Sequence, residues 1–228
     1  GRIMCLNSTD GSPVWTIELT NALSRQACGG LAVGDVDSDG HLDLVAVTRG
    51  SLFIVDQHAP FGEVLFIDAY TGEIRWSQYM YGHGTSVAIG DITGDEQLEI
   101  VAACDESDWE VDSYDALYVF NSGGNLLWSK GWTEEAAYYT NLSSAVLADF
   151  SYASQPDYAV LTHMYGDNNS RLWLFDGDDG ERRQDALDIY GSSLSSPTLF
   201  DGFGDEDLDY AVGSDDSSVL SLTLLYIY

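Results

Sequence analysis

Short apolar runs recur along the chain, and each is followed by a segment rich in glycine or aspartate. The runs favour leucine, β-branched and aromatic residues, and none extends into a long stretch with the period of an amphipathic helix. Short apolar runs bounded by turn-forming residues are typical of β-strands. The pattern therefore predicts an all-β chain.

One repeated unit joins two such runs through an aspartate-rich loop. It spans residues 32–47, returns at 88–101, and occurs in more divergent form at 147–160 and 199–212. The leading aspartates of the four copies are separated by 56, 58 and 52 residues, and they are Asp35, Asp91, Asp149 and Asp201. A recurrent spacing of this kind indicates one structural unit copied along the chain.

A second unit interleaves with the first and carries a glycine four residues before a tryptophan. It occurs at 11–15, 72–76 and 124–128, whereas the copy at 180–184 ends in Gln184. Each copy lies between two apolar runs, which is the pattern of a β-hairpin with glycine in its turn. We expect the tryptophans, Trp15, Trp76 and Trp128, to pack within or between the repeated sheets.

Together the two units give four short strands in each repeat of roughly 55 residues. A four-stranded sheet repeated without helices predicts a β-propeller, because each sheet can bury its faces only against its neighbours. A solenoid is the alternative, although its repeats are usually shorter. Three whole blades, from residue 31 to about residue 184, are flanked by partial blades. We expect a single propeller domain over 1–228, either closed by its ends or, as we favour, a fragment of a larger propeller.

The first aspartate loop has the donors of a cation site. Aspartates occupy positions 1, 3, 5 and 9, Gly40 permits a sharp bend, and the residue at position 7 can offer a backbone carbonyl. An all-oxygen, anionic set of this kind suits Ca²⁺, and without a cation its carboxylates would repel one another. An EF-hand would need an acidic ligand at position 12, where Ala46 stands in a strand-like run. The expected ligands are Asp35, Asp37, Asp39, Asp43 and the carbonyl of His41.

The other loops keep this set to different degrees. The second keeps every position, the fourth lacks a donor at position 3, and the third, with Asp149, Ser151 and Asp157, lacks position 5. We expect affinity to fall from the first loop to the second and then the fourth, with the third empty, so that two or three Ca²⁺ ions bind. The expected ligands are Asp91, Thr93, Asp95, Gln97 and Glu99 in the second loop, and Asp201, Asp205, Asp207 and Asp209 in the fourth.

The loops, with a Gly-Asp before them and Leu-Asp-Leu-Val at 42–45, resemble FG-GAP repeats of integrin α-subunit propellers. The hairpin at 66–76 is similar to the PQQ-like repeat. The resemblance covers nearly the whole chain, although the Phe-Gly and Gly-Ala-Pro signatures are absent. It implies calcium in the loops between the first two strands of each blade, and no enzymatic activity by itself.

Charge restricts the partners. The chain has 38 acidic residues against 8 lysines and arginines, for a formal net charge of −30, and 27 of the acids are Asp. Nucleic acids and anionic membrane surfaces would be repelled. No apolar run of membrane-spanning length is present, and no signal peptide is visible at Gly1. The excess of Asp favours turns and ion sites, and it also fits adaptation to salt.

Aromatic residues gather in the connections expected on the face opposite the aspartate loops, where Tyr79 also lies. Aromatic rings beside carboxylates suit a glycan or a protein ligand, although they equally suit packing between blades. The candidate ligand-face residues are Tyr81, His83, Trp109, Trp132, Tyr138 and Tyr139.

These features predict an extracellular, calcium-stabilised recognition or adhesion module. One alternative is a calcium-dependent polysaccharide lyase, although no catalytic motif is present and we expect no enzyme. The other is a structural subunit of a surface layer or filament that associates through its open terminal blades. Three sequons, beginning at Asn7, Asn141 and Asn168, favour a secreted glycoprotein, and Cys5, Cys28 and Cys104 allow either one disulfide or three thiols.

Overall fold

The computed structural model describes residues 1–20, 27–50, 62–105, 115–131, 144–148, 158–165, 169–182, 187–190, 196–200, 209–213 and 222–225. Within these ranges every regular element is a β-strand. No helix long and apolar enough to cross a membrane occurs among them.

Three four-stranded antiparallel sheets follow one another along the chain, and in each the strands are ordered as in the sequence. We call these sheets blades 1, 2 and 3. Blade 1 contains β3 (Ala27–Gly34), β4 (Asp43–Arg49), β5 (Gly62–Asp68) and β6 (Ile74–Met80). Blade 2 contains β7 (His83–Gly90), β8 (Glu99–Asp105), β9 (Asp115–Phe120) and β10 (Leu126–Gly131), and blade 3 contains β11 (Val146–Ala148), β12 (Tyr158–Tyr165), β13 (Asn169–Asp176) and β14 (Leu187–Tyr190).

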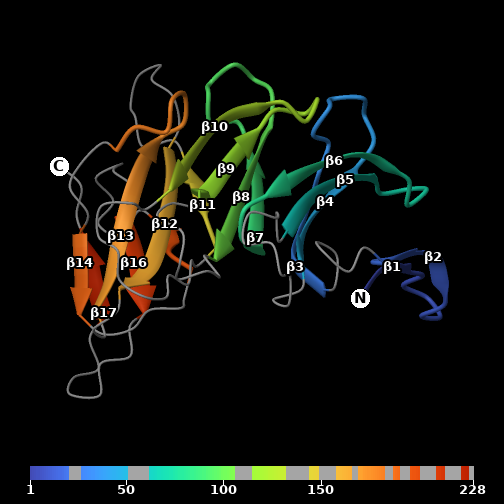
Figure 1. Cartoon of the computed structure of the whole chain (residues 1–228), viewed down its shortest axis with the longest axis horizontal. Coiled ribbons are helices and arrows are strands. Elements are labelled where there is room, and N and C mark those ends of the chain that lie inside the picture. Colours follow the sequence, from blue (N-terminus) through green and yellow to red (C-terminus); the bar gives the residue numbers. More distant parts are fainter. Residues whose placement is uncertain are drawn as a thin grey trace.

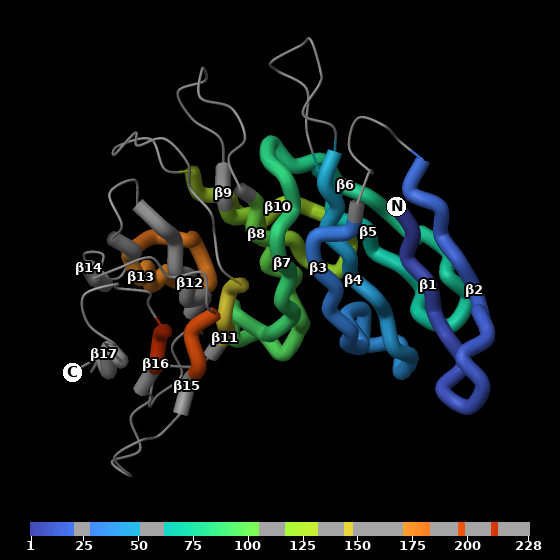
Figure 2. The backbone as a smooth tube through the Cα atoms, turned by 90° about the horizontal axis from the view of Figure 1, so that it is seen from below, coloured from blue at the N-terminus to red at the C-terminus, as the bar shows by residue number. Residues whose placement is uncertain are grey.

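Partial blades flank these sheets. Strands β1 (Arg2–Leu6) and β2 (Pro13–Glu18) pair at the N-terminal end, and β15 (Thr198–Phe200), β16 (Asp209–Gly213) and β17 (Leu222–Leu225) pair at the C-terminal end. The blades succeed one another across the molecule, with β1 and β2 at one side of it and β14 and β17 at the other (Figure 1). The same succession is visible in the perpendicular view (Figure 2). The predicted architecture of three whole blades with partial terminal blades is confirmed.

The middle strands explain why the blades must stack. Every residue of β4 except Arg49 is buried, and so is every residue of β5 except Asp68. A strand buried on both faces needs an apolar neighbour on each side. One core cluster joins Phe66 of blade 1 to Tyr118 and Phe120 of blade 2, and a second joins blades 2 and 3.

The repeated tryptophans lock each blade to the hairpin turn of the next. The indole Nε1 of each donates to a backbone carbonyl in that turn: Trp15 to Ala69 at 3.0 Å, Trp76 to Ser122 at 2.9 Å and Trp128 to Gly177 at 2.7 Å. The ring also covers a turn glycine, where an added Cβ would lie 2.5–2.9 Å from the indole. These glycines, Gly72, Gly124 and Gly180, also have φ between 67° and 79°. The prediction that the tryptophans pack between blades is confirmed.

Two sequence expectations need correction. Tyr79 and His83 were expected in the connection between blades 1 and 2, but β6 and β7 extend further and leave only two residues between them. Residue 79 therefore belongs to β6 and residue 83 to β7. All three cysteines are free, so the disulfide alternative does not hold in this structure.

Candidate metal centre

Two aspartate loops lie within the described residues, and they have the same backbone conformation. Loop 1 (residues 35–43) follows β3 and ends on the first residue of β4, and loop 2 (residues 91–99) follows β7 and ends on the first residue of β8. Each has left-handed backbone at positions 4 and 6: Ser38 (φ 58°) and Gly40 (φ 85°) in loop 1, and Gly94 (φ 71°) and Glu96 (φ 67°) in loop 2. The glycine occupies a different one of the two positions in each loop, so the conformation does not depend on where glycine stands.

Hydrogen bonds from backbone amides to carboxylates hold this conformation. The position 9 carboxylate accepts from the amide at position 2, with Val36 N donating to Asp43 Oδ2 at 3.1 Å and Ile92 N to Glu99 Oε2 at 3.0 Å. The position 1 carboxylate accepts from the amide at position 6, and the position 5 carboxylate from the amide at position 7. Each loop thus gathers three carboxylates, from positions 1, 3 and 5 in loop 1 and from positions 1, 5 and 9 in loop 2.

A buried aliphatic side chain at position 2 fastens each loop to the core. Val36 and Ile92 are both 1% exposed, and each belongs to one of the clusters that join neighbouring blades. The acidic loops are therefore attached to the blade interfaces, although six of the nine residues of loop 1 and four of the nine of loop 2 are exposed.

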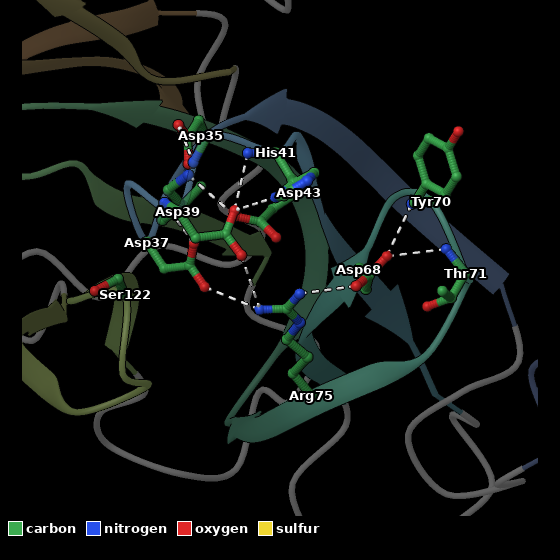
Figure 3. Close-up of polar contacts among 12 residues, drawn as sticks. Asp35, Asp37, Asp39, His41, Asp43, Asp68, Tyr70, Thr71, Arg75 and Ser122 are labelled. Atoms are coloured by element: carbon green, nitrogen blue, oxygen red, sulfur yellow. Dashed lines mark hydrogen bonds and ion pairs between the residues drawn. The ribbon is translucent and has the colours of Figure 1, made fainter.

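Two buried carboxylate oxygens of loop 1 have no hydrogen-bond partner among the described residues. Carboxylate oxygens of Asp35, Asp37 and Asp39 lie within 4.8 Å of one another. Asp43 is only 1% exposed, and its Oδ1, like Oδ1 of Asp35, is buried without a hydrogen-bond partner. Burial raises the pKa of the Asp43 carboxyl, and the nearby Asp37 carboxylate adds to this effect. Figure 3 shows these four aspartates gathered at one end of blade 1.

Loop 2 also has a cluster of carboxylates, but different oxygens lack hydrogen-bond partners. Carboxylate oxygens of Asp91, Asp95 and Glu99 lie within 4.8 Å of one another. Asp91 accepts three backbone amides, at 2.7–3.2 Å, whereas Thr93 Oγ1 is buried without a hydrogen-bond partner. Glu99 is 3% exposed, and burial raises the pKa of its carboxyl.

An arginine from the neighbouring hairpin lies against loop 1. Arg75 Nη1 donates to Asp37 Oδ2 at 3.0 Å and lies 3.7 Å from Asp39 Oδ2, while Nη2 donates to Asp68 Oδ2 at 2.7 Å. Figure 3 shows the guanidinium between Asp68 and the loop. The Arg75 hydrogen bond, with backbone donors of the turn, holds the pKa of Asp68 well below its usual range. Sequence analysis missed this residue, although one of only 8 basic residues in an acidic chain was a signal worth following.

The turn between β5 and β6 connects loop 1 to the preceding partial blade. Ala69 N donates to Leu42 O of loop 1 at 3.3 Å, and Ala69 O accepts the indole hydrogen bond of Trp15. The loop, the β5–β6 turn and the tryptophan of the preceding blade are thus joined through one residue.

The remaining predicted ligands lie partly outside the described residues. His41 and Gln97 occupy position 7, and their side chains approach the position 5 carboxylates at 3.2 Å. Asp209 begins β16, as the position 9 residue begins its strand in loops 1 and 2. The third loop and the rest of the fourth, with Asp201, Asp205 and Asp207, lie outside the described ranges.

The predicted ligand-face residues are also only partly described. Tyr81, just beyond the end of β6, is 44% exposed, whereas His83 is 4% exposed and therefore offers little surface to a ligand. Trp109, Trp132, Tyr138 and Tyr139 lie outside the described ranges.

The donors of both loops fit a hard divalent cation. They are carboxylate, hydroxyl and carbonyl oxygens, without a thiol among them, which suits Ca²⁺ or Mg²⁺ rather than a thiophilic metal. The buried, unpartnered oxygens are the strongest feature of this fit, because a buried polar atom without a partner is costly. Five candidate donors at alternate loop positions favour the larger, more flexible coordination sphere of Ca²⁺.

Comparison with known proteins identifies the repeat. The sequence model of a family described as "Outer membrane protein assembly factor BamB" matches residues 1–187. No curated protein matches the chain. The chain belongs to this BamB-type family of PQQ-like repeats.

One solved structure supports the fold. A crystal structure of the rhamnogalacturonan lyase YesW is 16% identical, with a TM-score of 0.53 over 82% of this chain and 41% of the lyase. The V. cholerae biofilm matrix protein Bap1 is 19% identical, with a TM-score of 0.38 over 87% of this chain and 35% of Bap1. The chain spans less than half the length of either structure.

Proposed function

We propose that this member of the BamB-type repeat family is a calcium-stabilised β-propeller that recognises a protein or glycan outside the cytoplasm. The observation that carries the calcium part is the pair of matching loops with buried oxygens that lack protein partners. In loop 1 the ligands would be Asp35, Asp37, Asp39, Asp43 and the His41 carbonyl. In loop 2 they would be Asp91, Thr93, Asp95, Glu99 and the Gln97 carbonyl.

The ion would act on the fold rather than on a substrate. Each loop is anchored in a blade interface through position 2, so an ion that neutralises its carboxylates stabilises the contact between blades. Calcium at loop positions between the first two strands of a blade is also the arrangement of FG-GAP repeats, which these loops resemble. Millimolar calcium is available outside the cytoplasm, which supports an extracellular or envelope location.

Recognition is supported by the family and by the surface opposite the loops. The family description names an outer membrane protein assembly factor, and a part in protein assembly favours a protein ligand. Tyr79 and Tyr81, toward the end of β6 that lies away from the loops, are 58% and 44% exposed. Exposed tyrosines combine apolar area with a hydrogen-bonding group, which suits either a protein or a sugar.

The test is a binding screen with a matched control. The purified chain is screened against glycans and unfolded outer-membrane-protein segments, with Ca²⁺ and with EGTA. The double variant Tyr79→Ser/Tyr81→Ser should lose at least tenfold in affinity for any ligand found, because aromatic anchors dominate such surfaces. The control is Tyr70→Ser, since Tyr70 is 85% exposed in the turn beside loop 1.

Three results would count against the recognition proposal. Equal losses in the double variant and the control would remove this face from it, and the absence of any ligand would contradict recognition itself. Turnover of an acidic polysaccharide, abolished by EGTA, would replace it with a lyase.

A further inference from the structure

Within the described part of the chain, Arg75 has no counterpart beside loop 2. The Gly-x-x-x-Trp unit aligns Arg75 with Leu127. The strand register, in which Ile67 pairs with Ile74 and Phe120 with Leu126, aligns Asp68 with Asn121. Leu127 is 43% exposed, so the position is accessible in blade 2 as well. Among the described residues, no lysine or arginine pairs with Asp91, Asp95 or Glu99. The two loops therefore share donors and backbone but differ in one fixed positive charge.

The position of that charge matters because Arg75 uses the oxygens that an ion needs. Its guanidinium bonds the position 3 carboxylate and approaches the position 5 carboxylate, and Asp68 holds it there from the other side. A cation binding to Asp37 and Asp39 must displace these contacts or lie close to a like charge. Both alternatives weaken cation binding.

We propose that Arg75 is an internal counter-ion that sets the calcium affinity of loop 1 below that of loop 2. This inference rests on the proposed calcium function and reverses the order expected from the sequence, in which loop 1 binds calcium more tightly than loop 2. Loop 2 fills first as calcium rises, and loop 1 fills at higher concentration. At low calcium Arg75 keeps the loop 1 carboxylates partly neutralised, so the loop retains its conformation without the ion.

The size of the effect follows from the exposure of the groups. The side chains of Arg75, Asp37 and Asp39 are 34%, 28% and 38% exposed, so solvent screens their interaction in part. A like charge within about 5 Å of a divalent ion under such screening corresponds to about a tenfold change in affinity. Since Arg75 contacts loop 1 and, among the described residues, no arginine contacts loop 2, its removal should change the calcium affinity of loop 1 alone.

The experiment reads each loop separately in the whole chain. The amides of Gly40 and Gly94 each donate to the leading aspartate of their own loop, so their ¹⁵N–¹H signals report binding at that loop. Calcium chloride is titrated into the wild type, Arg75→Leu and Arg75→Lys. A fourth protein, Leu127→Arg with Asn121→Asp, places the same ion pair in blade 2.

In the wild type the Gly94 signal should shift at lower calcium than the Gly40 signal. Arg75→Leu should tighten loop 1 about tenfold and leave loop 2 unchanged, Arg75→Lys should give a smaller change, and the blade 2 variant should weaken loop 2 about tenfold. Melting in EGTA checks folding, and there Arg75→Leu should melt below the wild type because four clustered carboxylates lose their counter-ion.

The outcomes separate the two proposals. If both glycines respond to calcium but Arg75→Leu leaves loop 1 unchanged or weaker, the counter-ion inference is wrong and the calcium function remains. If neither glycine responds in any folded variant, both are wrong.

Discussion

Loop 1 and loop 2 share two left-handed residues and three kinds of backbone-to-carboxylate hydrogen bond, yet within the described chain an arginine lies against loop 1 alone. The shared features come from backbone amides and from a buried side chain at position 2. The difference comes from a hairpin position outside the loop. The geometry of a cation site and its charge balance are therefore set by different parts of the blade, and each can change without the other.

Calcium removal gives the largest expected effect. An ion that binds only the folded state stabilises it by about 2.7 kcal/mol per site at a free concentration 100 times its dissociation constant. The melting temperature of the wild type should therefore rise on replacing EGTA with excess Ca²⁺. The rise should be much smaller for Asp37→Ala/Thr93→Ala, which removes the position 3 donor of both loops. Equal rises in differential scanning calorimetry would show that calcium acts elsewhere.

The anchors at position 2 should be the next most sensitive sites, and they test whether the two loops are attached alike. Ile92→Ala should lower the free energy of unfolding by about 2–4 kcal/mol and Val36→Ala by somewhat less, because each leaves a cavity at a blade interface. Urea unfolding in EGTA measures both, with Leu42→Ala as the control, since Leu42 is 60% exposed. Losses no larger than that of the control would mean that the loops are not fastened through these residues.

Neutralising the position 9 carboxylates should stabilise the protein without calcium and destabilise it with calcium. In EGTA, Asp43→Asn and Glu99→Gln should each stabilise the protein by about 1 kcal/mol at neutral pH, because burial raises the pKa of both carboxyls and disfavours their charged forms. The sign follows because a carboxyl whose pKa is raised in the folded state lowers the free energy of unfolding as the pH rises above its pKa in the unfolded state. Neutral pH lies above that value, so removing the charge should stabilise the protein. In excess calcium both variants should destabilise, since a ligand is lost. Destabilisation of similar size in both conditions would argue against an ion at position 9.

Substitutions at the residues with left-handed backbone should have the smallest effect. Glycine stands at position 6 in loop 1 and at position 4 in loop 2, so the same substitution tests opposite positions in the two loops. Ser38→Gly and Glu96→Gly should each raise the free energy of unfolding by up to about 1 kcal/mol, because glycine adopts positive φ without strain. Gly40→Ala and Gly94→Ala should each lower it by about 1 kcal/mol. Urea unfolding measures the four variants, and a stabilising Gly40→Ala would contradict the shared conformation.

Much of this fold follows from local sequence. The fixed spacing of the two units predicts the four-stranded blades, and the Gly-x-x-x-Trp spacing predicts the hairpins on which the indoles dock. These features can be predicted from the sequence because the same contacts recur in every repeat. The ends of the strands are harder to predict, since β6 and β7 extend through polar and aromatic residues that sequence analysis assigned to a connection.

In the candidate site, too, contacts local in sequence are predictable and contacts between distant residues are not. Alternating acidic residues predict the two ligand clusters, because their spacing lies within one loop. The contact of Arg75 with Asp37 joins residues 38 apart in sequence, and it depends on which hairpin position faces the loop. Position 75 is Arg in one repeat and Leu in the next, so the repeat pattern that reveals the fold does not reveal this charge.

Anomalous diffraction from crystals grown in calcium tests the central claim most directly. The account predicts anomalous density bounded by Asp35, Asp39 and Asp43 in loop 1, and by Asp91, Asp95 and Glu99 in loop 2. Crystals soaked in EGTA should lose both peaks while keeping the blades. Loops without density in saturating calcium, with Arg75 still bonded to Asp37, would contradict it.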